Sequence, residues 1–307
     1  MNLQIERMYD ELRRRMQRER DDRAEYIYRQ VPELATIPEK RRTLVKDAAL
    51  KRITPAQAAE QLDILDREER KLLAENGFSK DMLEIQFNCP ICRDTGWIGD
   101  AERKPCSCRL KLLAETDPSM GINSRQTFER FSEDIFPTEA QRRQTRTARI
   151  WCEQYADALP SPEKKNLLLT GMAGLGKTFL CNAIAYRALS RGIEARIITA
   201  YMFIQDVLDG IRTKTGGVPE FCLRVPLLVI DDLGSESVIP NISEEALFSV
   251  LNERIHAGMP TVVATNLSYA ALQERYGERV TSRLADRTVT QAIQLTGENL
   301  RRKQGQC

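Results

Sequence analysis

The sequence predicts an α/β fold, a three-layer sandwich around a mostly parallel five-stranded sheet. Short apolar stretches typical of buried parallel strands alternate with segments whose apolar residues recur at helical spacing. One stretch also runs directly into a glycine-rich turn and then a helix, which is the order of a parallel strand–helix unit. The predicted strands are residues 166–169, 195–199, 227–230, 261–265 and 290–296.

A glycine-rich turn follows the first predicted strand. Its sequence is Gly171-Met172-Ala173-Gly174-Leu175-Gly176-Lys177-Thr178, with Phe179 next. This is the spacing of a P-loop, in which glycines let backbone N–H groups converge on phosphate oxygens. We expect Lys177 to bind the β- and γ-phosphates of ATP, and Thr178 to bind Mg²⁺ at the start of a helix. The alternative is an ordinary glycine-rich turn before a helix.

Paired acids end the third predicted strand, in the run Leu227-Leu228-Val229-Ile230-Asp231-Asp232-Leu233-Gly234. Carboxylates at the carboxyl end of a buried parallel strand lie where α/β sheets bind nucleotides. We expect Asp231 to join the magnesium shell and Asp232 to orient and deprotonate the attacking water. Asn266, after the fourth strand, would reach the γ-phosphate or that water. The alternatives are that the two acids begin a polar turn and that Asn266 is a turn residue.

Helical patterns occupy the spaces between these strands. The first stops at Ser190-Arg191-Gly192, and a later one with Leu247, Val250, Leu251 and Ile255 stops at Gly258-Met259-Pro260. Between them, residues 201–223 predict a helix followed by a flexible loop. After residue 287 we expect only a final strand and a short basic tail at residues 301–303, without a helical lid domain.

Four cysteines form two close pairs, Cys89 with Cys92 and Cys106 with Cys108. Two such pairs predict a tetrahedral Zn²⁺ site with four thiolate ligands, although the Cys-x-Cys half is tighter than usual. Four cysteines close the coordination shell, so the expected role of this zinc is structural. An iron–sulfur cluster and four free thiols are the alternatives.

The first 78 residues are highly charged and predict helices with narrow apolar stripes. A helix is expected to begin at Thr54-Pro55, where Gln57 completes a capping box. Because narrow stripes need a partner surface, this arm is expected to bind another helix or another protein. We therefore divide the chain into a helical partner-binding arm at 1–78, a zinc module at 79–115, a linker at 116–137 and the P-loop domain at 138–307.

Composition limits the classes of protein that fit. The chain has 307 residues, 42% of them hydrophobic, which suits a globular protein with more than one folded unit. Its net charge of +2 gives no independent support for nucleic-acid binding. The amino-terminus is charged, and no run approaches the roughly eighteen apolar residues of a membrane span. We expect a cytoplasmic protein with reduced cysteines and no membrane partner.

From about residue 166 to residue 301, the chain resembles the ATPase domain of bacterial helicase loaders of the DnaC and DnaI type. These AAA+ proteins are related to DnaA and to the IstB transposition ATPases. The resembling residues are the P-loop, the Asp231-Asp232-Leu233-Gly234 run, Thr265-Asn266 and Gly277-Glu278-Arg279-Val280-Thr281-Ser282-Arg283-Leu284. A Cys-x-x-Cys, Asp-Thr-Gly, Cys-x-Cys segment also precedes the ATPase in many loader-like proteins.

The resemblance implies that residues 138–307 are an AAA+ ATPase domain and that Asn266 is sensor 1. It implies that Arg283 is an arginine finger completing a neighbour's site, with Arg279 a lesser candidate. Phe128 and Phe131 become candidates for the adenine pocket, with core packing as the alternative. Arg212 and Lys214 become candidates for single-stranded DNA contacts, with simple solvation as the alternative.

The expected function is ATP-dependent loading of the replicative hexameric DNA helicase by subunits that self-assemble through their ATPase domains and engage single-stranded DNA. An IstB-like ATPase that assists a transposase would share the catalytic residues and differ in its partner. A small-molecule kinase would need an acceptor pocket and an arginine-rich lid, neither of which is evident. A non-hydrolysing, nucleotide-gated binding protein is disfavoured by the intact Lys177, Thr178, Asp231 and Asp232.

Overall fold

The computed structural model describes residues 3–99, 102–214 and 216–300, so the predicted basic tail, Arg301, Arg302 and Lys303, lies outside the described residues. The chain forms two compact units, Met1–Asp100 and Ala101–Cys307. The division into four segments made from the sequence stays a prediction. Among the described residues, no helix combines the length and the apolar character that crossing a membrane requires.

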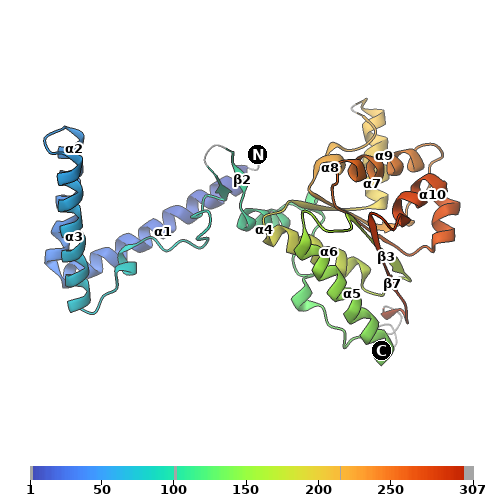
Figure 1. Ribbon diagram of the computed structural model, residues 1–307, viewed down its shortest axis with the longest axis horizontal. Helices are drawn as coiled ribbons and strands as arrows, with labels where there is room; N and C mark the ends of the chain where they lie inside the picture. Colours follow the sequence, from blue (N-terminus) through green and yellow to red (C-terminus); the bar gives the residue numbers. More distant parts are fainter. Residues whose placement is uncertain (1–2, 100–101, 215, 301–307) are drawn as a thin grey trace. The chain divides into compact units, whose positions relative to one another are not determined.

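The amino-terminal unit is helical, as the sequence predicts (Figure 1). It contains α1 (Leu3–Gln30), α2 (Ile37–Ala49) and α3 (Pro55–Glu75), with 3₁₀ turns η1 (Pro32–Thr36) and η2 (Lys80–Leu83) and the short strand β1 (Trp97–Ile98). The predicted capping box is confirmed: the Gln57 N–H donates to Thr54 Oγ1 at 3.2 Å, and the Thr54 N–H donates to Gln57 Oε1 at 2.9 Å.

A small apolar core holds the ends of these helices together. It is built from Ile27, Val31, Leu34, Ile37, Leu65 and Leu73. An ion pair adds to it, because Arg41 of α2 donates to both carboxylate oxygens of Glu69 on α3, at 3.2 and 2.8 Å. Glu69 is 5% exposed, and pairing offsets part of the cost of burying its charge. The helical stripes therefore pack partly on one another.

The carboxyl-terminal unit contains the predicted five-stranded parallel sheet. Its strands are β3 (Asn166–Gly171), β4 (Ala195–Thr199), β5 (Leu227–Leu233), β6 (Thr261–Thr265) and β7 (Thr290–Leu295). They lie in the order β4-β5-β6-β3-β7, and every neighbouring pair is parallel. Four of the predicted strands agree with the observed bounds to within two residues, while β5 continues three residues further, through both acids.

Helices cover both faces of this sheet and make the three layers (Figure 1). On one face lie α5 (Glu139–Ala158) and α6 (Lys177–Ser190), over strand residues such as Leu167 and Val229. On the other lie α7 (Ala200–Arg212), α9 (Ser243–His256) and α10 (Tyr269–Ala285), over residues such as Leu168 and Ile230. The unit also contains β2 (Lys104–Pro105), α4 (Ser107–Thr116), η3 (Pro118–Met120), η4 (Phe128–Arg130) and α8 (Glu220–Arg224). This is the three-layer α/β sandwich with a parallel five-stranded sheet that the sequence predicts.

Candidate functional site

The predicted P-loop connects the carboxyl end of β3 to the start of α6. Gly176 is the residue before α6 and has φ +90°, a left-handed conformation in which a side chain would be strained. A Cβ there would also lie 3.4 Å from the Phe131 ring. The helix begins at Lys177, so its first N–H groups and its positive dipole end face the inside of the turn. This geometry suits the phosphates of a nucleotide.

Lys177 projects into that turn although it is only 7% exposed. Its Nζ donates to Gly171 O at 2.7 Å, to Met172 O at 2.8 Å and to Asn266 Oδ1 at 2.7 Å. Asn266 in turn donates from Nδ2 to Asp232 Oδ1 at 2.8 Å. The P-loop lysine, the predicted sensor and the predicted catalytic acid thus form one hydrogen-bonded chain.

Asp231 and Asp232 leave β5 in different surroundings. Asp231 is 6% exposed, and the Thr178 hydroxyl hydrogen bonds to its carboxylate. A carboxylate beside a hydroxyl, both next to a phosphate cradle, is the oxygen-rich donor set that Mg²⁺ prefers. Asp232 is more exposed and has φ +55° at an irregularity in the β5–β6 register. Such a backbone costs free energy in a non-glycine residue, and strain of this kind is typical of functional sites.

Burial raises the pKa of the Asp231 carboxyl, and the hydrogen bond from Thr178 only partly opposes this. Between the ordinary carboxyl pKa and the raised one, the folded chain therefore holds a proton that the unfolded chain has lost, so stability falls as the pH rises through this window and then levels off. We expect Asp231→Asn to stabilise the nucleotide-free protein at pH 8 by about 1 kcal/mol, or 2–4 °C in Tm, and by less at pH 5. Thermal unfolding at the two pH values measures this.

Asp286→Asn is the opposite-sign control, because hydrogen bonds from Thr288 lower the pKa of the Asp286 carboxyl. Replacing this carboxylate with an amide should lower the stability of the protein at pH 8 and change it little at low pH. If Asp231→Asn is less stable than wild type at pH 8, the buried carboxylate does not destabilise the nucleotide-free protein, and this prediction is wrong.

Aromatic residues of the predicted linker form a wall beside the P-loop. Phe131 packs edge-on against Phe179, with ring centroids 5.2 Å apart, and also faces Gly176. Phe128 is buried under the Arg187 guanidinium, 5.8 Å from its ring centroid. Both candidates for the adenine pocket are thus packed residues, and Phe131 is the one in contact with the P-loop.

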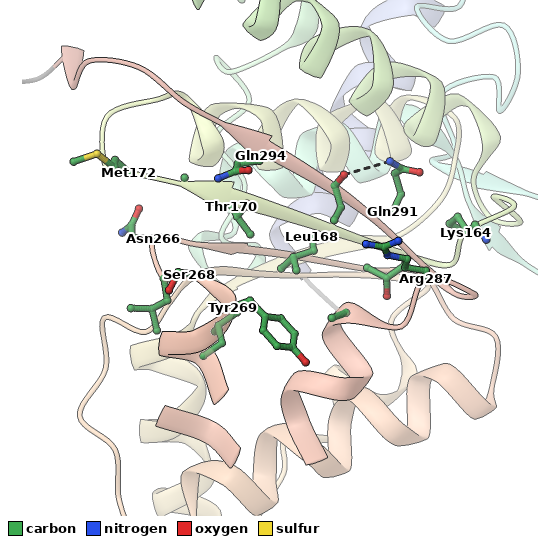
Figure 2. Close-up of a pocket in the computed structure, with 16 residues that line it drawn as sticks. Lys164, Leu168, Thr170, Met172, Asn266, Ser268, Tyr269, Arg287, Gln291 and Gln294 are labelled. Carbon is green, nitrogen blue, oxygen red and sulfur yellow. Dashed lines mark hydrogen bonds between the residues drawn. The ribbon is translucent and has the colours of Figure 1, made fainter. Parts of the chain in front are cut away.

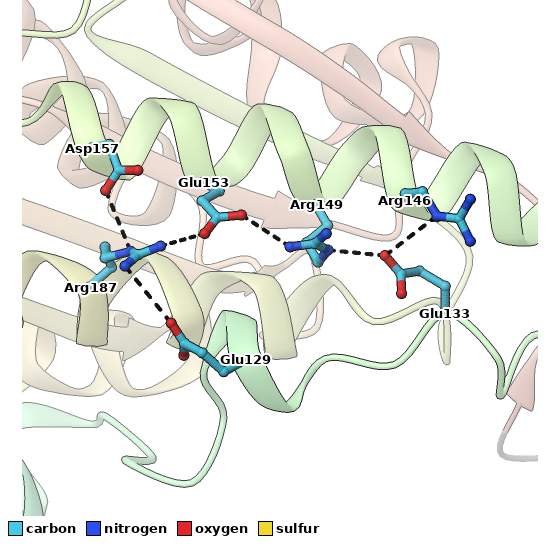
Figure 3. A network of polar contacts seen from close by, with 7 residues as sticks. All are labelled: Glu129, Glu133, Arg146, Arg149, Glu153, Asp157 and Arg187. Carbon is cyan, nitrogen blue, oxygen red and sulfur yellow. Dashed lines mark hydrogen bonds and ion pairs between the residues drawn. The ribbon is translucent and has the colours of Figure 1, made fainter.

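An ion-pair network holds this wall against α5 and α6 (Figure 3). Arg149 of α5 donates to Glu133 at 3.0 Å and to Glu153 at 3.0 Å. Arg187 of α6 bonds to Glu153 and lies 3.8 Å from Glu129. The members are Glu129, Glu133, Arg146, Arg149, Glu153, Asp157 and Arg187. Single pairs of this exposure are weak, but a network shared by three segments fixes their relative position.

The segment after β7 also reaches the P-loop, which the sequence did not indicate. Gln141 of α5 donates to Glu298 O at 3.2 Å, and Gln144 donates to Gln294 O at 2.9 Å. The Leu300 N–H then donates to Gly174 O at 3.4 Å. The sequence around these two glutamines does not predict such contacts, because their partners are backbone groups about 150 residues away.

A cavity of about 910 Å³ lies on the α10 side of β3 and β7 (Figure 2). Met172 and Asn266 line one end, and Lys164 and Arg287 line the other. Lys177 and Thr178 do not line it, so this cavity adjoins the phosphate cradle without being part of it.

The candidate arginine finger lies on α10, directed toward α9. Arg283 sits 6.0 Å from the Phe248 ring centroid, and Arg279 lies over the same ring at 4.1 Å and bonds to Glu245 at 2.8 Å. Among the described residues, no hydrogen bond or ion pair joins Arg283 to the P-loop or to the acids of β5. The structure therefore does not bring Arg283 into its own subunit's site.

The candidate DNA contacts lie at the far end of α7. Arg212 is exposed and donates to Asp209 at 2.6 Å, one turn earlier on the helix. Lys214 is exposed in a left-handed conformation, with φ +57°. The Arg212 pairing reduces its free positive charge, and both DNA contacts stay predictions.

The four paired cysteines come together. The Sγ atoms of Cys89, Cys92, Cys106 and Cys108 all lie within 4.8 Å of one another. The Gly96 N–H donates to Cys92 Sγ at 3.3 Å, and Asp94, fully buried, accepts from the N–H groups of Asn88 and Cys89 at 3.0 and 2.8 Å. Four sulfurs at this separation fit a tetrahedral metal ion. Among the described residues, no disulfide bond joins these cysteines.

Comparison with known proteins identifies the family to which the chain belongs. The chain matches DnaI, the replicative helicase loader of Bacillus subtilis, with 29% identity over 45% of this chain and 48% of that protein. It matches an ATP-binding protein of insertion sequence IS5376 from Geobacillus stearothermophilus with 33% identity over 45% of this chain and 56% of that protein. The chain thus spans about half the length of the curated relatives it matches.

Among solved structures, the crystal structure of the DnaC helicase loader aligns with a TM-score of 0.47 and 22% identity, over 56% of this chain and 97% of that one. Domain III of DnaA from Thermotoga maritima aligns with a TM-score of 0.47 and 24% identity, over 59% and 72%. The family model described as IstB-like ATP binding protein matches residues 124–306, which is more than half of the chain. This protein belongs to the IstB-like family of ATP-binding proteins.

Proposed function

We propose that this chain hydrolyses ATP at a site completed by two subunits and uses the cycle to load the replicative DNA helicase. The observation that carries the catalytic part is the hydrogen-bonded chain from Lys177 through Asn266 to Asp232. It connects the group that binds phosphate with the group that accepts a proton, at hydrogen-bond distances.

Each residue then has one role. Lys177 binds the β- and γ-phosphates, and Asn266 positions the water near the terminal phosphate. Asp232 orients that water and accepts its proton, which its partly exposed position and lack of a cationic partner among the described residues allow. Thr178 and Asp231 would hold Mg²⁺, which neutralises charge on the phosphates when bound.

A neighbouring subunit supplies the remaining cation in this proposal. Arg283 lies on the α9 side of α10 and is not bonded to its own P-loop, which supports a role at the site of the next subunit. Self-assembly would then switch hydrolysis on. Single-stranded DNA would bind the assembled subunits, with Arg212 and Lys214 as the proposed contacts.

We also propose that the four clustered cysteines bind a structural Zn²⁺. The donor set supports zinc because four thiolates close a tetrahedral shell and leave no open position for catalysis. The hydrogen bond from Gly96 to Cys92 Sγ is of the kind that stabilises a thiolate. We expect Cys106→Ser to lower zinc affinity by more than the roughly 10- to 100-fold typical of losing an outer-shell partner, measured as zinc per chain after dialysis.

Cys222→Ala is the matched control, since Cys222 is equally buried but distant in sequence from the pairs. It should keep its zinc. If purified wild-type chain holds iron instead, or retains no metal, the zinc assignment is wrong.

The helical arm is the proposed helicase-binding element. A cavity of about 560 Å³ lies between α2 and α3, and Leu44, Ile64 and Leu65 line it together with polar side chains. Ile64 is 54% exposed at its rim. An apolar hollow between two helices suits an apolar side chain of a partner protein.

The partner is tested directly with purified proteins. In ATP and Mg²⁺, the chain should co-elute with the hexameric replicative helicase of its own organism. Ile64→Glu should weaken that complex by about tenfold or more, because it places a charge at an apolar contact, while ATP hydrolysis stays unchanged. Ile150→Glu is the control, since Ile150 is 42% exposed on α5 of the other unit.

The second candidate is an ATPase that assists a transposase. It is favoured by the IstB-like family match and by the relative from insertion sequence IS5376. Co-elution with the transposase of a neighbouring mobile element, and not with the helicase, would select this candidate and reject the loader.

A further inference from the structure

Glu236 is a buried carboxylate that the proposed chemistry does not use. It lies on the loop after β5, two residues beyond Gly234, and is only 3% exposed. Its Oε2 accepts from the Gly234 N–H at 3.0 Å, and its Oε1 accepts from the Tyr276 hydroxyl. A buried carboxylate is costly unless such bonds compensate it, so these contacts hold the loop firmly.

The partner side chains lie on α10, immediately before a break in the helix. Arg275 donates to the backbone oxygen of Glu236 and stacks over the Tyr276 ring, 5.8 Å from its centroid. The next residue, Gly277, has φ +74° and ψ 172°, which is not helical. A Cβ on Gly277 would lie 2.7 Å from Glu244 Oε1, so the chain bends tightly against α9 at this point.

The helix resumes after this bend and carries both candidate arginines. The segment from Glu278 to Ala285, which we call the arginine segment, contains Arg279 and Arg283. Its direction relative to the sheet is set at Gly277, because a single non-helical residue separates it from Tyr276. Whatever fixes Tyr276 therefore fixes the start of the arginine segment.

The other end of the Glu236 loop is fixed to the nucleotide site. The Thr265 hydroxyl donates to Leu233 O at 2.6 Å, and Asn266 donates to Asp232 at 2.8 Å. The loop from Asp232 to Glu236 thus connects the acids of one site with the hinge of the segment that carries Arg283. No other hydrogen bond among the described residues joins that loop to α10.

We propose that Glu236 and Tyr276 form a positioning contact that orients the arginine segment of the same subunit, so that Arg283 reaches the neighbour's nucleotide. The inference rests on the proposed function, because it assigns a means of control to the shared site. The contact acts through Arg283 and does not touch the reacting atoms. We therefore expect loss of the Tyr276 hydroxyl to lower ATP hydrolysis when it occurs in the subunit that donates the arginine, and not when it occurs in the subunit that receives it.

Mixed assemblies separate these two cases. A Lys177→Ala chain can donate an arginine but cannot bind ATP, and an Arg283→Ala chain can bind ATP but cannot donate. Each alone should be inactive, and their mixture should recover hydrolysis in Mg²⁺ and single-stranded DNA. Tyr276→Phe is then placed either in the Lys177→Ala donor or in the Arg283→Ala acceptor, and kcat and KM for ATP are measured.

In the donor, Tyr276→Phe should lower the recovered kcat about tenfold with KM unchanged, which lies within the usual range of coupling between sites. In the acceptor it should change kcat less than about twofold. Tyr269→Phe in the donor removes a hydroxyl from the same helix on an exposed side chain, and should have no effect. Glu236→Gln in the donor retains an oxygen acceptor and should be milder than Glu236→Ala.

The outcomes are distinguishable. If the mixture of Lys177→Ala and Arg283→Ala chains, without a change at Tyr276, recovers no hydrolysis, the shared site is wrong and so is the positioning contact. If the mixture recovers hydrolysis but donor Tyr276→Phe has no effect, only the positioning contact is overturned. An equal loss in donor and acceptor also overturns it, because a merely structural hydroxyl would act in both.

Discussion

Asp232→Asn should lower the rate of ATP hydrolysis by about 10²–10⁴-fold and leave ATP binding nearly unchanged. The amide cannot accept the proton of the attacking water, but it keeps the size of the carboxylate and a hydrogen-bonding oxygen for Asn266. Asparagine also tolerates the left-handed backbone at φ +55°, so the turn should keep its shape. Single-turnover hydrolysis and equilibrium ATP binding, measured on the same protein, separate the two effects.

Asp206→Asn is the control for this change. Asp206 lies on α7, is partly buried and takes no part in the proposed chemistry. Its replacement should leave hydrolysis within about twofold of wild type, the scale of an indirect effect. Unchanged turnover in Asp232→Asn would remove this residue from the catalytic role and leave Asp231 as the acid to examine.

Lys177→Ala should weaken ATP binding by about 10²–10⁴-fold, because charge-assisted hydrogen bonds to two phosphates are lost. In the free protein the same ammonium donates to Gly171 O, Met172 O and Asn266 Oδ1, so the loop and the predicted sensor lose a shared partner as well. Titration with a fluorescent ATP analogue in Mg²⁺ measures the affinity.

Lys164→Ala is the matched control, since Lys164 lies just before the other end of β3 and donates to Thr288 O at 3.2 Å. It should bind ATP as wild type does. ATP affinity that survives in Lys177→Ala and falls in Lys164→Ala would move the nucleotide from the P-loop to the cavity beside it.

The parts of the fold that the sequence predicts are those with local causes. A capping box needs only Thr54 and Gln57 at fixed spacing, and it forms as expected. The P-loop needs glycines where φ is positive and a helix directly after them, and both are present. Buried parallel strands are recognisable because both of their faces must be apolar.

The contacts that sequence alone misses are those made by ordinary polar residues to distant partners. Arg254 has the pattern of a solvated helix residue, yet it is fully buried and donates to Cys222 O, Val225 O and Pro260 O. Nothing local to residue 254 signals those three acceptors. Burial lowers the pKa of its guanidinium to about 10, so the group is still charged at neutral pH.

The same limit applies within the candidate site. The sequence places Asp232 and Asn266 at strand ends and Lys177 after the P-loop turn that follows β3. It so predicts that they meet, because the carboxyl ends of parallel strands share one edge. It does not predict the kink at Gly277 or the bond from Tyr276 to Glu236, which depend on how α10 packs against α9. Backbone direction after a glycine is set by tertiary packing, since glycine itself imposes none.

The central claim is that the P-loop and the acids of β5 hydrolyse ATP at a site shared between subunits. The most direct measurement is phosphate release per chain as a function of chain concentration, with Mg²⁺ and single-stranded DNA present. The account predicts release that rises with concentration as subunits meet, and none in Lys177→Ala. Absence of phosphate release by the wild-type chain at every concentration, or a rate per chain independent of concentration, would contradict it.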